Sequence, residues 1–246
     1  MTWSIVARDP ATGQIGIAVA TCAFAVGGRV PYVRTGVGAV ASQAFVNPFY
    51  GPRGLDLLAG GASAVETVAA LVGSDTGRGD RQVHVLDGAG RLAAHTGADC
   101  VPWCGHILRE EFSVAGNMLA GPAVIEDTAA TFAATAGEPL HARLLAGLVA
   151  GEKAGGDKRG RQSAAILTHD GEDYPLVDIR VDDHADPLAE LGRLLAIWSG
   201  RPSHYRRAMP SRARPDGIVG RAAIERFIAE SSSGPAVASR DPTSSG

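Results

Sequence analysis

The sequence predicts an α+β fold of four layers, in which two mainly antiparallel sheets are stacked between two pairs of helices. Strand-like and helical segments come in separate blocks along the chain, which is typical of α+β proteins. Short turns at residues 9–13 and 87–90 join neighbouring strands and favour antiparallel pairing. A chain of 246 residues that is 45% hydrophobic can also fill the core of such a sandwich.

The first half of the chain reads mainly as strands. Apolar and β-branched residues surround each turn, which predicts hairpins. A helical stretch begins at Gly54, and Ser63 with Glu66 forms a capping-box pattern that predicts a second helix start. The strands expected in this half are residues 2–8, 15–21, 32–34, 38–44, 82–86 and 91–95.

The second half of the chain again contains separate blocks of strands and helices. We expect a helix starting at Pro187 with Asp186 as its cap. From Gly200 the composition changes to Arg, Pro and Ser. This change predicts one domain over residues 1–199 and a largely disordered tail over residues 200–246, in which residues 218–228 could form one short helix. The other expected elements are strands 112–116, 163–168 and 176–181, with helices near residues 122–135 and 140–149.

Charge and composition exclude several classes of partner. The net charge of −3 gives no electrostatic reason to expect binding to nucleic acid or to an acidic membrane. We see no stretch long enough to span a bilayer and no secretory signal. Three cysteines do not make a disulfide framework. We therefore expect a cytoplasmic protein that binds neither nucleic acid nor membrane.

Thr2 is the residue whose position in the chain indicates the most specific chemistry. Removal of Met1, which precedes a small residue, would give Thr2 a free α-amine beside its own hydroxyl. An α-amine titrates at about 7.7–8.0, so a neutral fraction can accept the hydroxyl proton. The alkoxide could then attack an amide carbonyl without a metal or cofactor. The alternative is an ordinary threonine behind a retained methionine.

The hairpin register predicts the neighbours of Thr2. If Asp9 pairs with Gln14, then Thr2 lies opposite Thr21. Cys22 and the small-residue loop at 23–28 would follow beside the nucleophile. This loop could let a substrate approach the backbone closely, or its small residues could simply pack the two sheets together.

Several segments form a set of motifs along the chain: residues 2–9, 38–44, 47–48, 50–54, 94–97, 116–119, 155–163 and 180–184. Together they resemble the domain-of-unknown-function 1028 family, over about residues 2–198. Members of this family resemble N-terminal nucleophile hydrolases, whose αββα sandwich is also used by the proteasome β subunit and penicillin acylases. The resemblance implies the fold directly and amide hydrolysis by analogy.

Polar residues elsewhere are candidates for the same site. Asn117 could donate to an oxyanion, or it could be a turn residue. If Lys158 lies near Thr2, its positive charge would lower the pKa values of the Thr2 amine and hydroxyl. The alternative is that Lys158 belongs to an exposed basic loop. Gln43 and Asn47 could bind an amide or carboxylate of the substrate, or they could have structural roles in turns and helix caps.

Two arginines and one histidine complete the candidates. Arg159 and Arg161 could hold a substrate carboxylate through bidentate bonds. His95 could line the pocket or cap a strand. The pair Asp182 and His184 offers too few ligands for a metal, so we expect no metal site.

These features lead to one main hypothesis and two alternatives. The main hypothesis is a cytoplasmic amidohydrolase that uses Thr2 on a small amide, a cyclic amide or a short peptide, and that forms homodimers by analogy with related folds. The low aromatic content argues against a large hydrophobic acyl pocket. The second is a catalytically silent binding or scaffold protein. The third is a hydrolase whose nucleophile is Cys22 or Ser4.

Overall fold

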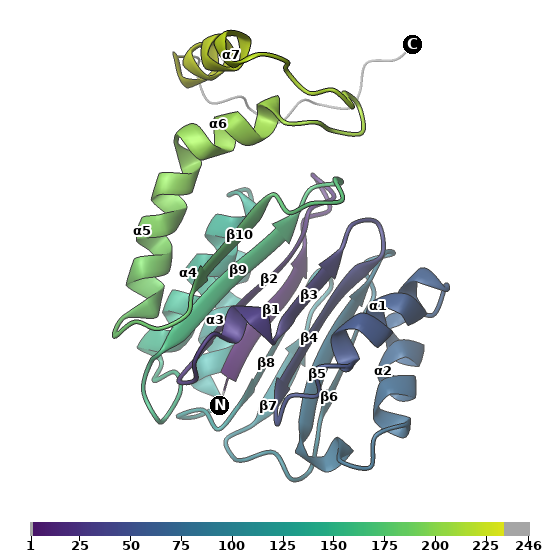
Figure 1. The fold of residues 1–246 in the computed structure, drawn as a ribbon. Helices are drawn as coiled ribbons and strands as arrows, with labels where there is room; N and C mark the ends of the chain where they lie inside the picture. Colours follow the sequence, from purple (N-terminus) through teal and green to yellow (C-terminus); the bar gives the residue numbers. More distant parts are fainter. Residues whose placement is uncertain (1, 234–246) are drawn as a thin grey trace. The chain divides into compact units, whose positions relative to one another are not determined.

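Two sheets lie face to face between two pairs of helices (Figure 1). The computed structural model describes residues 2–233. Every strand pairing recorded in the two sheets of this part of the chain is antiparallel. The predicted four-layer αββα sandwich is therefore confirmed.

The larger sheet has six strands in the order β10-β9-β2-β1-β8-β7. β1 and β2 lie in its middle and are buried along almost their whole length, because apolar residues occupy both faces. The sequence did not predict β7, a four-residue edge strand that is half-exposed. The strands are β1 (Thr2–Arg8), β2 (Ile15–Thr21), β7 (Gly105–Leu108), β8 (Phe112–Asn117), β9 (Ser163–His169) and β10 (Val177–Val181).

The smaller sheet has the order β3-β4-β5-β6 and is covered by α1 (Tyr50–Ala59) and α2 (Ala64–Gly73). The predicted capping box starts α2: the Ser63 hydroxyl accepts the Glu66 N–H, and Glu66 accepts the Ser63 N–H at 2.8 Å. The strands are β3 (Pro31–Arg34), β4 (Gly38–Ala44), β5 (Arg81–Asp87) and β6 (Leu92–Thr96).

Close packing against α4 (Leu140–Lys153) holds β1 in place. This helix pairs with α3 (Ala123–Ala134) on the outer face of the larger sheet. A Cβ atom at Gly147 would lie 2.7 Å from Ile5 Cδ1, and one at Gly151 would lie 2.7 Å from Trp3 Nε1. The two glycines therefore give β1 its close approach to the helix, with Trp3 fully buried beside Thr2.

The chain divides into two compact units, one ending at Gly192 and the other starting at Arg193. Asp186 caps α5 (Pro187–Ser199) as predicted, because its carboxylate accepts the Ala189 N–H at 3.1 Å. The remaining helices are α6 (Arg201–Ala208) and α7 (Arg221–Ser233).

Two helices lie within the tail predicted over residues 200–246, at residues 201–208 and 221–233, and the second overlaps the short helix considered over residues 218–228. α6 packs on α7, and the Arg201 guanidinium donates to both carboxylate oxygens of Glu225 at 2.8 and 2.9 Å. The Arg-rich, Ser-containing sequence of α6 lacks an apolar periodicity, so its helix could not be predicted. Residues 234–246 of the predicted tail lie outside the described residues.

Candidate active site

Thr2 begins the central strand of the larger sheet, with a neighbour on each side. The predicted hairpin register is confirmed, since Trp3 pairs with Ala20. The Thr2 hydroxyl donates to the Thr21 hydroxyl at 3.2 Å, and on the other side Thr2 pairs with Asn117 of β8. Met1 lies outside the described residues, so its removal stays a prediction.

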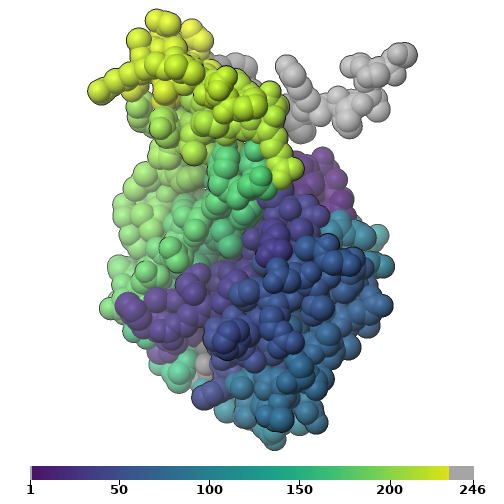
Figure 2. Space-filling model, turned by 45° about the vertical axis from the view of Figure 1, so that its right-hand side comes forward, coloured from purple at the N-terminus to yellow at the C-terminus, as the bar shows by residue number. Residues whose placement is uncertain are grey.

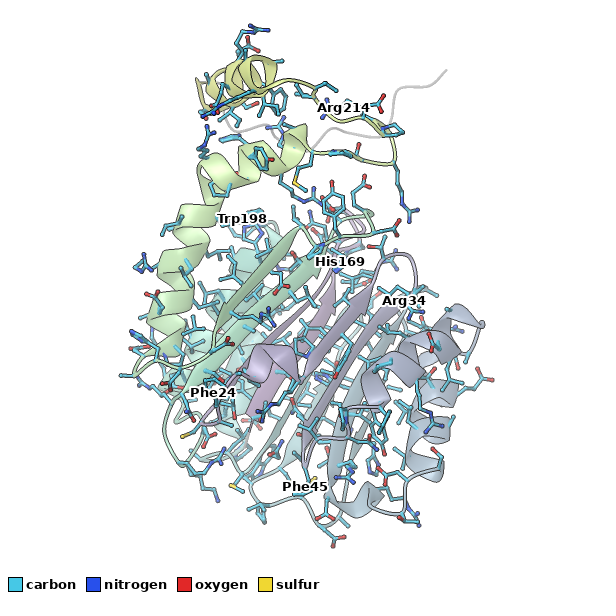
Figure 3. The ribbon with its side chains drawn as sticks, viewed as in Figure 1. Phe24, Arg34, Phe45, His169, Trp198 and Arg214 are labelled. Atoms are coloured by element: carbon cyan, nitrogen blue, oxygen red, sulfur yellow. The ribbon has the colours of Figure 1, made fainter. Side chains whose placement is uncertain are left out.

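A cavity of about 320 Å³ opens at Thr2. One wall is the loop and 3₁₀ turn after β2, including the exposed Phe24, and the other is residues 44–46 at the end of β4, including the exposed Phe45 (Figure 3). Both segments lie on the face shown in Figure 2, in purple and dark blue. Thr2 is 7% exposed, so its side chain lies at the bottom of this cavity.

The loop after β2 is anchored at both ends. The Cys22 N–H donates to Asp157 Oδ2 at 2.8 Å, and the Val26 N–H donates to the Ser163 hydroxyl at 3.1 Å. Between these anchors, the backbone N–H groups of Ala23 and Phe24 have no hydrogen-bond partner among residues 2–233. Both residues line the cavity at Thr2, so two of its lining residues have uncommitted backbone donors.

The glycines of this loop have different surroundings. A Cβ atom at Gly27 would lie 2.5 Å from Arg180 Cδ and 2.7 Å from Ala165 Cβ. A Cβ atom at Gly28 would approach only the end of the Arg180 side chain, at 3.8 Å. Gly27 therefore packs closely against β9 and β10 of the larger sheet, and these contacts do not decide between the two predicted alternatives.

Asp157 joins this loop to Arg159. Its carboxylate, which is fully buried, accepts the Cys22 N–H and the Arg159 N–H, each at 2.8 Å. It also pairs with the Arg159 guanidinium at 3.2 Å. Arg159 lines the cavity, as expected of a substrate-binding residue. The role of Asp157 could not be predicted from the sequence, because 135 residues separate it from Cys22.

A buried polar network lies behind Thr2, between the sheets. Gln82 Nε2 donates to the backbone carbonyls of Gly116 at 2.9 Å and Gly105 at 3.1 Å. Since a carbonyl can only accept, these two bonds orient the Gln82 amide. Its oxygen accordingly accepts from Gln43 Nε2 at 2.7 Å and from Asn117 Nδ2 at 2.9 Å.

The same logic assigns the proton on His84. Gln43 presents its oxygen to Ser4, so the Ser4 hydroxyl donates to it at 2.6 Å. Ser4 must then accept from His84 Nε2 at 2.8 Å, which leaves His84 Nδ1 to accept from Ser113 at 2.7 Å. Burial lowers the pKa of His84 to about 3, consistent with a neutral ring.

This network has consequences for two predicted residues. Ser4 is fully buried and its hydroxyl is committed to Gln43, so the geometry does not support Ser4 as a nucleophile. Asn117 directs its amide protons to Gln82 and, at 3.4 Å, to the Thr2 carbonyl. Its carbonyl oxygen has no hydrogen-bond partner within residues 2–233, so Asn117 presents an acceptor and not a spare donor.

Three other predicted residues lie near the loop without lining the cavity. Lys158 is bound to the Pro102 carbonyl, to which its ammonium donates at 2.6 Å. Arg161 pairs with Glu152 and with Asp186. Cys22 follows Thr21 directly, is half-buried, and has its Sγ 3.7 Å from the Arg159 carbonyl oxygen.

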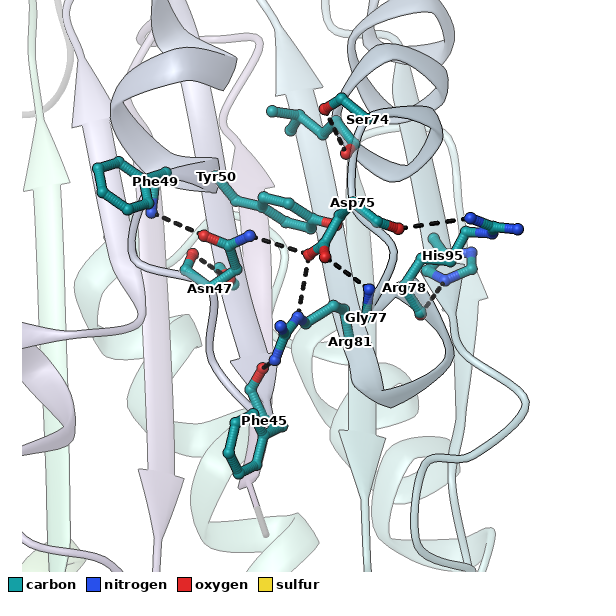
Figure 4. A network of polar contacts seen from close by, with 12 residues as sticks. Phe45, Asn47, Phe49, Tyr50, Ser74, Asp75, Gly77, Arg78, Arg81 and His95 are labelled. Atoms are coloured by element: carbon teal, nitrogen blue, oxygen red, sulfur yellow. Dashed lines mark hydrogen bonds and ion pairs between the residues drawn. The ribbon is translucent and has the colours of Figure 1, made fainter.

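Asn47 and His95 belong to a different cluster, centred on Asp75 (Figure 4). Asn47 Nδ2 donates to Asp75 at 2.9 Å, and His95 contacts the Arg78 carbonyl at 3.0 Å. The bond from Asn47, together with that from Arg81, holds the pKa of Asp75 well below its usual range. Neither Asn47 nor His95 lines the cavity at Thr2.

Residues 2–233 contain neither a metal-binding cluster nor a membrane-spanning helix. No three His, Cys, Asp or Glu side chains in this range are grouped closely enough to hold a metal ion. Within the same range, none of the helices has the length and apolar character needed to cross a membrane.

Comparisons with known proteins agree with the fold. The crystal structure of protein SPO2555 from Silicibacter pomeroyi, itself assigned to DUF1028, has a TM-score of 0.82 and 32% identity, covering 89% of this chain and 99% of that one. Anbu (ancestral beta-subunit) from Yersinia bercovieri covers 80% of this chain and 96% of that one, but its 10% identity and TM-score of 0.39 are too low to support any inference.

Sequence comparison gives the family. No curated protein matches the chain. The model of a "Family of unknown function (DUF1028)" matches residues 2–191, which confirms the resemblance predicted from the motifs. The chain therefore belongs to the DUF1028 family.

Proposed function

We propose that this protein is an amidohydrolase whose nucleophile is the Thr2 hydroxyl, exposed for catalysis by removal of Met1. One observation carries the proposal: Thr2 begins the central strand at the bottom of a cavity, with its hydroxyl paired to Thr21 at 3.2 Å. The strand and its packing on α4 hold this terminus firmly, as a reacting group requires.

The proposed reaction has two steps. The neutral α-amine of Thr2 takes the hydroxyl proton, and Oγ1 forms a bond to the substrate carbonyl carbon. The C–N bond then breaks, and the amine leaves with the proton, which gives an ester on Thr2. Water, activated by the same α-amine, adds to this ester and releases the acid, so that the hydroxyl and the amine are restored.

The oxyanion of each tetrahedral intermediate needs preorganised donors. The unpartnered N–H groups of Ala23 and Phe24, on the cavity wall, support a backbone oxyanion hole. Asn117, whose amide protons are directed to Gln82 and the Thr2 carbonyl, is better suited to positioning the strand end. Lys158 is bound to Pro102 and is not needed for this proposal.

Substitution of Thr2 tests the proposal. Intact-mass measurement first establishes that purified protein lacks Met1, and a panel of small amides, lactams and dipeptides then supplies an assay. We expect Thr2→Ala to lower turnover on the order of 10³-fold or more, and Thr2→Ser to keep a measurable rate.

Cys22→Ala is the matched control, because the geometry argues against Ser4 and leaves Cys22 as the alternative nucleophile. We expect this variant to retain turnover. Full turnover by Thr2→Ala would exclude the proposed mechanism. Loss of turnover in Cys22→Ala alone would identify the Cys22 thiol as the nucleophile. Absence of turnover on the whole panel would favour the silent binding protein.

A further inference from the structure

The cavity at Thr2 adjoins a second cavity of about 260 Å³, to which Asn117 contributes. Ala44 and Phe45 line both, so they form a shared wall. Thr2 and Asn117 are paired across β1 and β8, which places the proposed nucleophile where the two cavities meet. A ligand at Thr2 could therefore extend in both directions.

The two cavities carry opposite charges. Arg29 and Arg159 line the first, and no acidic side chain of residues 2–233 lines it. Arg159 is compensated by the buried Asp157, whereas exposed Arg29 has no hydrogen-bond or ion-pair partner in the same range. The first cavity thus holds an uncompensated positive charge together with apolar side chains that include Val26, Val30 and Val46.

The second cavity is acidic. Asp80 and Asp99 line it, both are exposed, and neither side chain has a partner within the described range 2–233. Asn117, only 3% exposed, lines the same cavity, and its carbonyl oxygen is without a hydrogen-bond partner there. The nearby Arg81 does not neutralise these carboxylates, because it pairs with Asp75 at 3.0 Å.

We infer that the site takes a small zwitterionic amide, with a carboxylate recognised by Arg29 on one side of Thr2 and an ammonium recognised by Asp80, Asp99 and the Asn117 oxygen on the other. An amide bond flanked by these two charges is the chemistry of a dipeptide. The inference rests on the proposed function in placing the amide at Thr2. Charge complementarity and the two cavity volumes set the ligand class.

Binding to the Thr2→Ala variant tests the inference without turnover. Titration calorimetry would compare L-alanyl-L-valine with its N-acetyl derivative and its C-terminal amide, each of which lacks one charge. We expect the zwitterion to bind about tenfold to a hundredfold more tightly than either blocked compound, the range of a hydrogen bond to a charged group. Equal affinities for the three compounds would overturn the inference.

Second substitutions, each in the Thr2→Ala background, locate each charge. Arg29→Met should weaken binding of the free dipeptide about tenfold and leave its C-terminal amide unaffected. The double substitution Asp80→Asn and Asp99→Asn should weaken binding of the free dipeptide about tenfold and leave binding of its N-acetyl derivative unaffected. Arg34→Met, which removes an exposed arginine paired with Asp56, is the control. If Arg29→Met weakens binding of the dipeptide no more than this control does, the carboxylate does not bind at Arg29.

Different results would rule out the proposed function and the proposed ligand class. Tight binding of the zwitterion by Thr2→Ala with no hydrolysis by the trimmed wild-type protein would leave the ligand class standing and remove the amidohydrolase. Hydrolysis of blocked and free dipeptides at equal kcat/KM would keep the amidohydrolase and remove the charge recognition.

Discussion

His84 shows how single residues make the site rigid. Its ring bridges Ser4 of β1 and Ser113 of β8, so one neutral imidazole joins the smaller sheet to two strands of the larger one. The proton arrangement follows from Gln82, whose amide is oriented by two backbone carbonyls. A change in the charge of His84 would therefore disturb the hydrogen bonds behind Thr2.

The pKa of His84 gives an expectation for stability. It is about 3 in the folded protein, below the unfolded value of about 6.5, so only the unfolded state gains this proton between these pH values. The free energy of unfolding should fall as the pH drops through this window, and this group alone should contribute about 2 kcal/mol between pH 7 and 5. Urea denaturation at the two pH values measures it.

His84→Gln isolates this contribution from that of other acid-sensitive groups. The decrease in unfolding free energy from pH 7 to 5 should be smaller in this variant than in the wild type. His184→Gln, which removes an exposed histidine, is the control. Identical decreases in wild type and His84→Gln would mean that His84 is not a buried neutral base.

Part of the site could be predicted from the sequence at this scale. The position of Thr2 opposite Thr21 follows from the turn and the period of two along a strand. The roles of Gln82 and Asp157 could not be predicted, because they depend on contacts between segments far apart in the chain. For the same reason, the sequence could not tell that Lys158 would bind Pro102.

The contact between β1 and α4 is the element-scale feature on which Thr2 depends. Gly151 of α4 faces Trp3, the residue that follows Thr2. A Cβ atom there would lie 2.3 Å from Thr128 Oγ1, 2.7 Å from Trp3 Nε1 and 3.0 Å from the Val124 carbonyl oxygen. Any side chain at this position must push apart the helix pair or the strand.

Gly151→Ala should therefore destabilise the protein. The overpacking is expected to cost about 1–3 kcal/mol of unfolding free energy, and the displaced strand should also lower turnover. Gly73→Ala is a matched control at the end of α2, where no atom lies within 4 Å of the added Cβ. This control should be neutral or gain up to about 1 kcal/mol. Equal stabilities of the two variants would contradict the packing described for Gly151.

Elements with a local signal could be predicted, and those without one could not. The capping box of α2 and the Asp186 cap of α5 depend on residues three positions apart. β7 carries no such signal, since it has four residues and is ordered by pairing with β8. α6 is held by α7 and by the Arg201–Glu225 pair, which a local pattern does not reveal.

At the scale of the whole molecule, the two compact units differ in their cores. The unit ending at Gly192 buries nearly all the hydrophobic core, including both sheets. From Arg193 to residue 233, the buried hydrophobic side chains are only Leu195, Ala208 and Ile228. An exposed ion pair such as Arg201–Glu225 adds little to stability.

Hydrogen exchange should separate the units. We expect the backbone amides of α6 and α7 to exchange well before those of β1 and β2, because local opening costs least where few apolar groups are buried. Exchange followed by mass spectrometry of peptides from the intact protein measures this difference. Equal protection in both regions would show that the second unit is as stable as the sandwich.

Chemical labelling of Thr2 tests the proposed nucleophile most directly. Purified protein would be treated with a β-lactone, which acylates an activated nucleophile, and its N-terminal peptide would be sequenced by mass spectrometry. We expect a peptide that begins at Thr2 and carries the acyl group on the Thr2 hydroxyl. A peptide that still begins with Met1, or a label found on Cys22 instead, would contradict it.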